Sequence, residues 1–508
     1  MAERQQWRSK LGFILAASGS AIGLGNVVFF SANAYKFGAG AFYIPYLVAL
    51  LLIGIPIMIL EFGLGHYTRK AFPQSLGQVA GKPGEFFGWW AILNACFIAM
   101  FYITILGWVV AMWVGSFGGL WQDAIAVPAL GKEAGEWAVP KAYFYSQITQ
   151  WKTAGFVALI WFLNAVIVWK GIRSIEKAVT IFVPLMWIFM IVLIVRGLTL
   201  PHGFEGVLFL FTPDFDALTK VHVWQGAFSQ IFFTLSLGFG IMTAYASYLP
   251  KESDQVNNAL MTSCLNCSFE FIAGIAIFSM LFVFAIAPEG GTLSMMFFVA
   301  PQGIAALPFG AKIFGILFFT MLLFAGLSSS ISLVEALASG LEDKFGTSRG
   351  KLVVMITVFG TVGSILFALP MIVNQGTDHA GVLGLTLLDV IDHWSFKYGL
   401  LVAGLVECVL IAWIFGARRL VNSINETSRI PLGSWFVAFV QLVLPLLLVV
   451  VIGWSIKVEV EKGTLYGSGH IDNFAALGYI GFAVWVLGTL GGAFLLTRGG
   501  GKEVVADA

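Results

Sequence analysis

A run of small and polar residues interrupts the first long apolar stretch of the chain. This run, residues 19–26 with the sequence GSAIGLGN, contains three glycines within seven positions and ends on Asn26. Inside a membrane, irregular backbone is tolerated only where it lines a polar cavity or is buried in protein. A helix that restarts there offers N–H groups to an anionic ligand, and a helix that stops offers carbonyl oxygens to a cation such as sodium. The run therefore predicts a ligand site at a broken membrane helix.

Two further polar runs lie inside apolar segments. Residues 234–240 (TLSLGFG) contribute the hydroxyls of Thr234 and Ser236, and residues 328–330 are three consecutive serines. Serine and glycine in membrane helices often serve only close packing, and that alternative stays open for the serine triplet in particular. Paired interruptions in two halves of a chain are typical of the binding site of a secondary transporter.

The composition indicates an all-α polytopic membrane protein. Of the 508 residues, 59% are hydrophobic and only 11% are charged, whereas soluble domains carry about 25% charged residues. A membrane span needs about 20 mostly apolar residues, and charged or turn-rich stretches divide the chain into twelve such segments. We expect them at about 11–36, 40–67, 88–114, 153–170, 177–197, 222–248, 257–287, 309–342, 352–372, 383–416, 432–456 and 474–497.

The distribution of basic residues predicts the orientation of these spans. Most of the 28 Lys and Arg residues fall in tails and loops that are cytoplasmic if the N-terminus is cytoplasmic. An even number of spans then returns the C-terminus to the same side. We expect a multi-pass protein of the cell (inner) membrane with both termini in the cytoplasm, and folded caps at the outside loops 115–152 and 198–221.

The polar runs and their surroundings resemble the neurotransmitter:sodium symporter family, and in particular its prokaryotic amino-acid transporters. The similarity extends over nearly the whole chain, and the run at 230–240 is especially specific. The stretches that carry it are residues 7–26, 38–42, 45–46, 230–240, 246–248, 265–266 and 325–330.

The resemblance implies a single transmembrane domain over residues 1–508, with twelve helices. Helices one to five (about 11–197) and six to ten (about 222–416) would be inverted repeats, with discontinuous helices one and six. Helices eleven and twelve (about 432–497) would be peripheral. It also implies alternating access driven by a sodium gradient.

The resemblance places two sodium ions at the first break. Sodium site 1 would consist of the carbonyl oxygens of two residues, three side chains and the substrate carboxylate, from Ala21, Asn26, Thr234 and Asn266. Sodium site 2 would consist of three carbonyl oxygens and two hydroxyls, from Gly19, Ile22, Ala325, Ser328 and Ser329. The family often has Thr or Asp at position 328, so the serine here keeps the oxygen ligand but changes its charge and packing.

The resemblance also places an amino-acid substrate between the two breaks. Its carboxylate would meet the N–H groups of Leu24 and Gly25 and the Tyr102 hydroxyl. Its ammonium would meet oxygens of Ala21, Phe233, Thr234 and Ser236, and its side chain would meet Ile98, Phe233, Phe239, Ser329 and Leu333. Gly23 stands where monoamine transporters of the family carry an aspartate. The apolar wall suits a neutral, aliphatic side chain.

Glu270 is the most informative carboxylate inside a predicted span, because such groups are costly and usually functional. Chloride-dependent members of the family have serine there, so the resemblance implies chloride independence. We expect Glu270 near Tyr46, Gln230 and Thr234. A neutral, hydrogen-bonded structural carboxyl is the alternative.

The gates show one departure from the family pattern. The outer-gate aspartate corresponds to Asp392, but the arginine that pairs with it is replaced by Phe29. Lys36 or Lys397 could reach Asp392 through water, or Phe29 could close the vestibule by packing over Phe239. The inner-gate positions match the family at Arg4, Trp7, Ser247, Tyr248 and Asp343.

The sequence as a whole predicts a chloride-independent symporter that imports sodium with a small neutral amino acid. The alternative is a substrate-binding sensor, or a gate-altered member with little concentrative transport. The expected partners are the amino acid, Na⁺ and the lipid bilayer, with a homodimer left open and nucleic acid not expected. No cluster of catalytic residues points to an enzyme.

Overall fold

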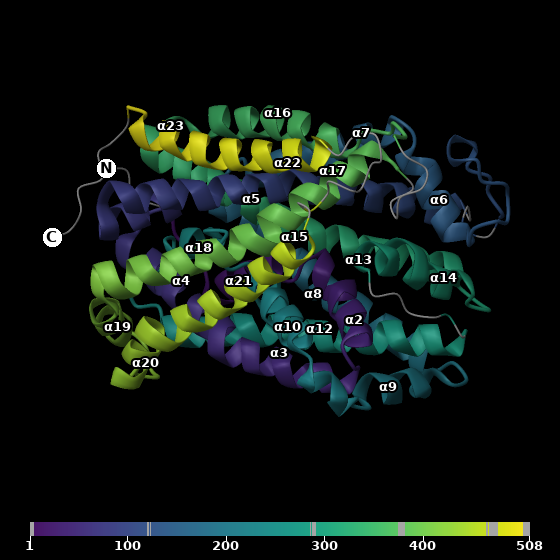
Figure 1. The fold of residues 1–508 in the computed structure, drawn as a ribbon, viewed down its shortest axis with the longest axis horizontal. Helices are drawn as coiled ribbons and strands as arrows, with labels where there is room; N and C mark the ends of the chain where they lie inside the picture. Colours follow the sequence, from purple (N-terminus) through teal and green to yellow (C-terminus); the bar gives the residue numbers. More distant parts are fainter. Residues whose placement is uncertain are drawn as a thin grey trace.

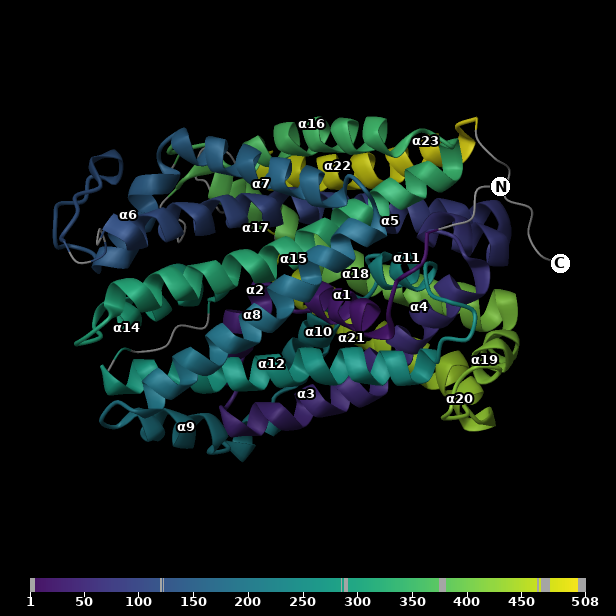
Figure 2. The same cartoon turned by 180° about the vertical axis from the view of Figure 1, so that it is seen from behind.

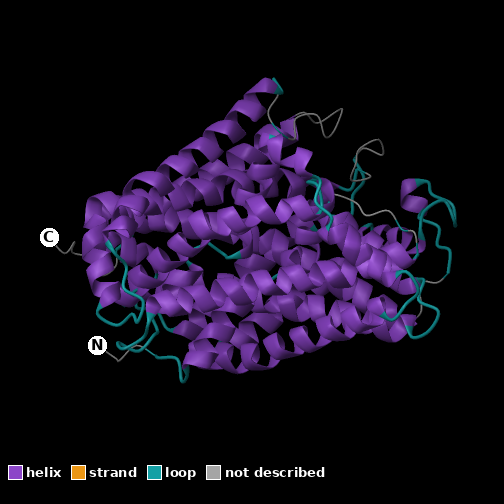
Figure 3. Ribbon diagram, turned by 90° about the horizontal axis from the view of Figure 1, so that it is seen from below, coloured by secondary structure: helices purple, strands orange, loops and turns teal. Residues whose placement is uncertain are grey.

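The computed structural model describes residues 5–118, 121, 123–284, 286, 291–373, 381–463, 466 and 476–500. Within these ranges the chain consists of helices and loops, with no strand (Figure 3). The predicted gate residue Arg4 lies outside the described residues. The α-helices are α1 Lys10–Ala21, α2 Leu24–Lys36, α3 Tyr43–Ala49, α4 Ile55–Thr68, α5 Phe72–Gly118, α6 Val139–Ile148, α7 Lys152–Val168, α8 Ile172–Leu198, α9 Gly203–Phe211, α10 Val221–Thr234, α11 Ile241–Ala246, α12 Gln255–Val283, α13 Thr292–Ser294, α14 Ala300–Ala305, α15 Ala311–Phe345, α16 Arg349–Phe367, α17 Leu383–Asp392, α18 Leu400–Val409, α19 Ala417–Asn425, α20 Ser434–Ala438, α21 Leu444–Glu461, α22 Ala476–Val486 and α23 Gly492–Arg498.

Tighter and wider helical turns join several of these helices into longer rods. The 3₁₀ turns are η1 Gly40–Phe42, η3 Pro128–Leu130 and η4 Phe215–Thr219, and the π-helical turns are η2 Leu50–Gly54, η5 Met295–Val299, η6 His393–Gly399, η7 Leu410–Gly416, η8 Phe439–Val443 and η9 Leu487–Gly491. Because π-helical turns are rare and cluster at functional sites, η6 is notable: it directly follows Asp392.

The helices form one elongated bundle. In Figures 1 and 2, α6, α9 and α14 gather at one end of the long axis, and α19 and α20 lie at the other. We call these the outer end and the inner end, after the predicted orientation. The described parts of the two predicted outside caps are folded, since they contain α6 and α9.

The number of membrane-length helices differs from the predicted twelve. Among the described residues, nine helices are long and apolar enough to cross a membrane, or up to eleven if each bent pair is one span. The predicted span 222–248 is not among them, because a break divides it into helices of 14 and 6 residues. The coarser prediction, a multi-pass all-helical bundle, is confirmed.

The first break is two residues long. Helix α1 ends at Ala21, α2 restarts at Leu24, and their axes differ by 50°. Most residues of α1 and α2 are buried against other apolar parts of the bundle. A broken helix therefore crosses the interior of the bundle rather than its surface.

The second break runs from Leu235 to Gly240, between α10 and α11. Three of its residues have a positive φ: Ser236 (54°), Gly238 (74°) and Gly240 (72°). Glycine adopts this conformation without strain, but serine does so rarely. The break is fixed from α4, because the Gly238 N–H donates to Glu61 Oε1 at 2.9 Å.

A polar cap fixes the inner end of α12. The N–H groups of Asn257 and Arg429 donate to the two oxygens of Asp254, each at 3.0 Å. Burial alone would raise the pKa of the Asp254 carboxyl, but these hydrogen bonds hold its pKa below the usual value. The cap thus connects α12 to the loop between α19 and α20.

Candidate substrate and ion site

The released backbone groups of the first break have identifiable partners. The Leu24 N–H donates to the Tyr102 hydroxyl at 3.0 Å, and the Gly23 N–H donates to Asn26 Oδ1 at 2.8 Å. The Ser20 carbonyl accepts hydrogen bonds from Ser236 Oγ at 3.2 Å and Ser329 Oγ at 2.8 Å. One carbonyl thus joins α1, the second break and α15.

A small cavity of about 30 Å³ lies between the two breaks. Eight of the eleven predicted substrate residues line it: Ala21, Ile98, Tyr102, Phe233, Ser236, Phe239, Ser329 and Leu333. Leu24 and Gly25 instead line the larger outer cavity described below, and Thr234 Oγ1 takes part in the asparagine cluster next to the cavity. The structure therefore brings the predicted substrate residues together around the break.

Ser20, Gly23 and Ile241 also line this cavity but were not predicted substrate contacts. The sequence could have identified Ser20, because it lies in the last helical turn before the break. Carbonyl oxygens in that turn lose their helical partners. Gly23 leaves no room for a side chain, because a Cβ there would lie 2.8 Å from the Tyr102 hydroxyl and 2.9 Å from Ser329 Oγ.

The side chains of predicted sodium site 1 converge. Asn26 Nδ2 donates to Thr234 Oγ1 at 2.9 Å and to Asn266 Oδ1 at 2.7 Å, and Asn266 Nδ2 donates to Thr234 Oγ1 at 2.9 Å. All three residues are buried. The cluster gathers neutral amide and hydroxyl oxygens of the type that binds hard cations, so its chemistry fits a sodium ion.

The residues of predicted sodium site 2 join α1 to α15. Ser328 Oγ and Ser329 Oγ donate to the Ala325 carbonyl at 2.9 and 3.2 Å. A Cβ at Gly19 would lie 3.7 Å from Ser328 Cβ, so the two helices touch there. Ile22, the fifth predicted ligand, directly follows α1 as its C-cap. The two hydroxyls and the nearby carbonyls again form an oxygen-only set.

Glu270 lies beside site 1, and the sequence-based prediction of its neighbours is confirmed. Tyr46 and Thr234 both donate hydrogen bonds to its carboxylate, and Gln230 Nε2 lies 3.3 Å from Oε2. Glu270 is fully enclosed, and no described cation pairs with it. Thr234 therefore links a buried carboxylate directly to the asparagine cluster.

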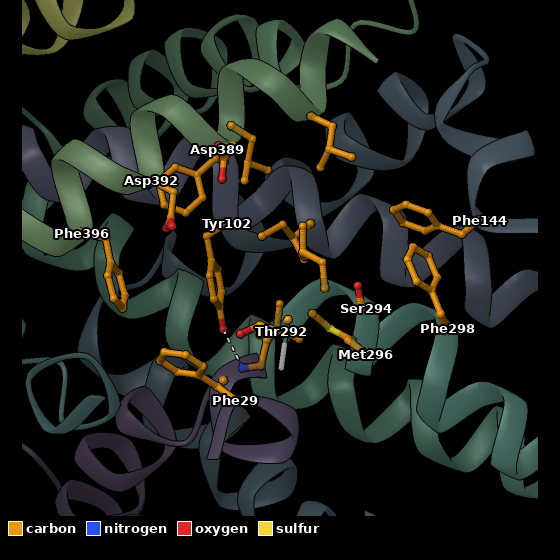
Figure 4. Close-up of a pocket in the computed structure, with 18 of the residues that line it drawn as sticks. Phe29, Tyr102, Phe144, Thr292, Ser294, Met296, Phe298, Asp389, Asp392 and Phe396 are labelled. Atoms are coloured by element: carbon orange, nitrogen blue, oxygen red, sulfur yellow. Dashed lines mark hydrogen bonds between the residues drawn. The ribbon is translucent and has the colours of Figure 1, made fainter. Parts of the chain in front are cut away.

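A cavity of about 530 Å³ opens above the first break, toward the outer end. Figure 4 shows Asp389 and Asp392 on one wall, with Phe144 and Phe298 across from them. Tyr102 and Phe233 line both this cavity and the central one. These two side chains therefore form the partition between the outer cavity and the predicted substrate site.

The predicted outer gate is aromatic, but its contact differs from the expectation. Phe29 packs on Phe233, with ring centroids 6.0 Å apart, and Phe396 packs on the same ring at 4.4 Å. The expected packing over Phe239 is therefore wrong. Gly25 makes room for the Phe233 ring, since a Cβ there would lie 2.6 Å from Phe233 Cε1.

Asp392 makes no ion pair with any residue that the structure describes. Lys36 and Lys397 line a second outer cavity together with Asp392, but neither lies within ion-pair distance of it. The outer partition thus rests on aromatic packing rather than on a charge pair.

We therefore expect Phe29→Ala to raise the dissociation rate of bound substrate more than Asp392→Ala does. Loss of the Phe29 ring removes one of the two rings packed on Phe233, a contact worth about 0.5–1.5 kcal/mol beyond burial, so bound substrate should dissociate several-fold faster. Asp392→Ala should change the dissociation rate less. Dissociation of a labelled amino acid from purified protein measures both rates, and a larger effect of Asp392→Ala would contradict the aromatic gate.

The inner end is closed by contacts of the N-terminal segment. Trp7 N donates to the Tyr248 carbonyl at 3.1 Å, and Trp7 Nε1 donates to the Tyr245 carbonyl at 2.9 Å. The Ser247 hydroxyl, directly after α11, donates to the Ala244 carbonyl in that helix. Asp343 accepts a hydrogen bond from the Ala71 N–H at 2.7 Å. Trp7, Ser247 and Tyr248 are buried, so these three predicted inner-gate positions lie in a closed region.

Sequence reasoning missed two charged members of this region. The Tyr248 hydroxyl donates to Glu335 at 3.0 Å, and Arg349 forms an ion pair with the same carboxylate. Arg349 also contacts Glu342 at 3.3 Å and donates to the Val168 carbonyl at 3.0 Å. No local pattern links Arg349 to the gate, because it is 101 positions from Tyr248.

Comparison with known proteins identifies relatives over most of the chain. The profile described as the sodium:neurotransmitter symporter family matches residues 4–126 and 145–486. An uncharacterized sodium-dependent transporter of Methanocaldococcus jannaschii is 39% identical over 472 residues, covering 89% of this chain and 90% of the relative. A sodium-dependent dopamine transporter of Caenorhabditis elegans is 28% identical over 487 residues, covering 85% and 77% of the two chains.

A solved structure shares the fold. The crystal structure of MhsT in complex with L-phenylalanine is similar with a TM-score of 0.76 and 31% sequence identity, covering 88% of this chain and 99% of that one. The sequence similarity and the arrangement of the helices thus lead to the same group of proteins.

Proposed function

Since the chain belongs to the sodium:neurotransmitter symporter family, a family of membrane transporters and not of enzymes, we propose that it imports a neutral, aliphatic amino acid together with sodium. The observation that carries this proposal is the adjacency of the two predicted sites. Thr234 lies in the hydrogen-bonded cluster of site 1, and its neighbours Phe233 and Ser236 line the central cavity. Substrate and ion would therefore bind in contact with each other.

The proposed substrate contacts follow from the first break. The carboxylate binds at the Leu24 and Gly25 N–H groups and the Tyr102 hydroxyl, which already lies 3.0 Å from the Leu24 nitrogen. The ammonium binds at oxygens of Ala21, Phe233, Thr234 and Ser236. Ile98, Phe239 and Leu333 supply an apolar wall without a buried charge, which favours a neutral side chain. The relative MhsT is described in complex with L-phenylalanine, which supports an amino acid as the substrate class.

The proposed coupling uses sodium as a second cargo. Site 1 takes oxygens of Ala21, Asn26, Thr234 and Asn266, and site 2 takes oxygens of Gly19, Ile22, Ala325, Ser328 and Ser329. Glu270 supplies a fixed negative charge beside site 1, so transport proceeds without chloride. Opening of the outer partition and of the inner gate would alternate around these sites. We propose that the chain has twelve helices in an inverted-repeat arrangement. We also propose that it lies in the inner membrane with both termini in the cytoplasm.

Uptake into proteoliposomes tests the function. With an inward sodium gradient, we expect labelled neutral amino acids to accumulate above their equilibrium concentration, and potassium in place of sodium should abolish the accumulation. Replacing chloride by gluconate should leave uptake unchanged. Asn26→Ala, which removes one side chain of site 1, should raise the sodium concentration needed for half-maximal uptake.

A sensor is the second candidate, because the outer gate lacks its usual arginine and has Phe29 instead. Sodium-dependent binding without accumulation would favour the sensor. In that case Phe29→Arg is the first variant to examine, since Asp392 lines the same cavity. Absence of both binding and uptake for the whole amino-acid panel would contradict the proposed substrate class.

A further inference from the structure

A further cavity lies on the outside of the bundle and shares no lining residue with the substrate site. A groove of about 540 Å³ runs between α7 and α16, which lie side by side along one edge of the bundle in both Figure 1 and Figure 2. Its walls are Phe162, Ala165, Val166, Trp169, Lys170, Val354, Thr357 and Val358. The only hydroxyl among them, that of Thr357, donates to the Val353 carbonyl of its own helix at 2.7 Å.

Apart from Lys170 and Thr357, the walls of the groove are therefore apolar, and the groove is exposed. Phe162, Val166, Val354 and Val358 are each more than half exposed (59%, 55%, 51% and 59%). In a protein of a membrane transporter family, this surface faces hydrocarbon. A groove with these walls fits an acyl chain.

One end of the groove is different, because it is basic. Trp169 is 48% exposed and directly precedes the exposed Lys170. Tryptophan is enriched at the membrane–water interface, which places Lys170 at the level of lipid headgroups. Arg173 lies in the first turn of α8 and Lys351 in the first turn of α16, and both are exposed.

The basic end carries charge that the described residues do not neutralise. Lys170, Arg173 and Lys351 form no ion pair with any described residue. The acidic side chains nearby have other partners: Glu335 and Glu342 contact Arg349, and Glu176 accepts from the Arg8 N–H and the Ser9 hydroxyl. An anionic headgroup would complement the three free cations.

The same end is joined to the inner gate. Arg349 Nε donates to the Val168 carbonyl, the last residue of α7, and the Arg349 guanidinium pairs with Glu335. Glu335 in turn accepts from Tyr248, whose carbonyl accepts from the Trp7 N–H. Only Trp169 thus separates Val168, whose carbonyl accepts from Arg349, from Lys170.

We propose that the groove between α7 and α16 binds an anionic phospholipid, with an acyl chain along the apolar walls and the phosphate at Lys170, Arg173 and Lys351. By holding the end of α7 against Arg349, the lipid stabilises the closed inner gate. The proposal that the lipid binds depends only on the groove and its charges. The proposed effect on the gate depends, in addition, on the proposed function.

Native mass spectrometry of the purified full chain tests the binding step. Phosphatidylglycerol should bind more tightly than phosphatidylcholine with the same acyl chains. Three basic groups contribute a preference for phosphatidylglycerol over phosphatidylcholine on the order of a hundredfold in affinity. Lys170→Gln, Arg173→Gln and Lys351→Gln together should remove the preference, and Val358→Trp should weaken both lipids by filling the groove.

A charge-matched control distinguishes this site from general attraction to basic residues. Lys82, Lys251 and Arg418 are exposed and lie outside the groove, so their triple glutamine variant should keep the preference. Equal binding of the two lipids by the wild type, or equal losses in the two triple variants, would overturn the proposal. A Val358→Trp variant that loses a dimer but binds both lipids as tightly as the wild type would overturn it in favour of a second copy of the chain.

Hydrogen exchange measures the effect on the gate. In vesicles that contain phosphatidylglycerol, amides of residues 244–249 should exchange several-fold more slowly than in phosphatidylcholine, and the groove triple variant should remove the difference. Loss of transport with an intact lipid preference would contradict the proposed function alone. An intact transporter without the preference would contradict the lipid site alone.

Discussion

Replacing Glu270 with serine is expected to make uptake depend on chloride. The glutamate lies in a closed pocket with Tyr46, Gln230 and Thr234, and Thr234 connects it to the site 1 cluster. A sodium ion bound there would lose its fixed counter-charge in Glu270→Ser, and an unbalanced charge inside a membrane protein costs about 2.5–3.5 kcal/mol. Uptake without chloride should therefore fall roughly a hundredfold, and added chloride should restore much of it.

Glu270→Gln is the matched control for this prediction. The amide keeps the size of the side chain and part of its hydrogen bonding, but it has no charge and leaves no room for an anion. Uptake should fall as in the serine variant, and chloride should not restore it. Uptake measured at several chloride concentrations separates the two variants. Full activity of both variants without chloride would show that Glu270 is a structural carboxyl.

Breaking the ion pair between Lys344 and Glu85 is expected to give the largest loss of stability. The two side chains lie 2.7 Å apart, with exposed fractions of 5% and 4%, and they join α15 to α5. Glu85 also accepts a hydrogen bond from Trp89 Nε1 at 3.2 Å. Removing one member of a buried pair leaves a charge without a partner and typically costs about 3–5 kcal/mol.

A double-mutant cycle tests this second prediction by thermal unfolding in detergent. Lys344→Met and Glu85→Leu should each lower the unfolding temperature strongly. The double variant Lys344→Met/Glu85→Leu should recover much of the loss, because no charge then remains buried. As a control, Lys132→Met breaks an exposed pair with Glu136 and should change stability by at most about 1 kcal/mol. Losses in the two single variants that simply add in the double variant would show that the residues act independently.

The site residues could be predicted from the sequence because they are polar groups within apolar segments. Glycines and hydroxyl residues at 19–26 and 234–240 interrupt apolar helices, and hydrocarbon penalises that conflict unless the released backbone has a partner. Glu270 was informative for the same reason. Its three predicted neighbours are the ones the structure shows, although Tyr46 lies in α3, far in the sequence from Gln230 and Thr234 in α10.

Other parts of the site depend on which helices face each other. The Phe29 ring packs on Phe233 rather than Phe239, and the Ser20 carbonyl collects hydroxyls from positions 236 and 329. Arg349 reaches Glu335, the α7 terminus and the inner gate at once. Each of these contacts joins common residue types across long sequence separations, so no local pattern distinguishes them from surface or packing residues.

By itself, the sequence determined the all-helical membrane class, the position of the two breaks and the identity of the polar groups beside them, because each follows from local composition and the need to pair every backbone group in hydrocarbon. Only the tertiary structure decided how the breaks lie against each other, which aromatic rings separate the two cavities and how the inner gate connects to the basic end of the α7–α16 groove. These depend on the relative rotation and depth of packed helices, which changes the contacts of a side chain without changing the pattern of its own segment.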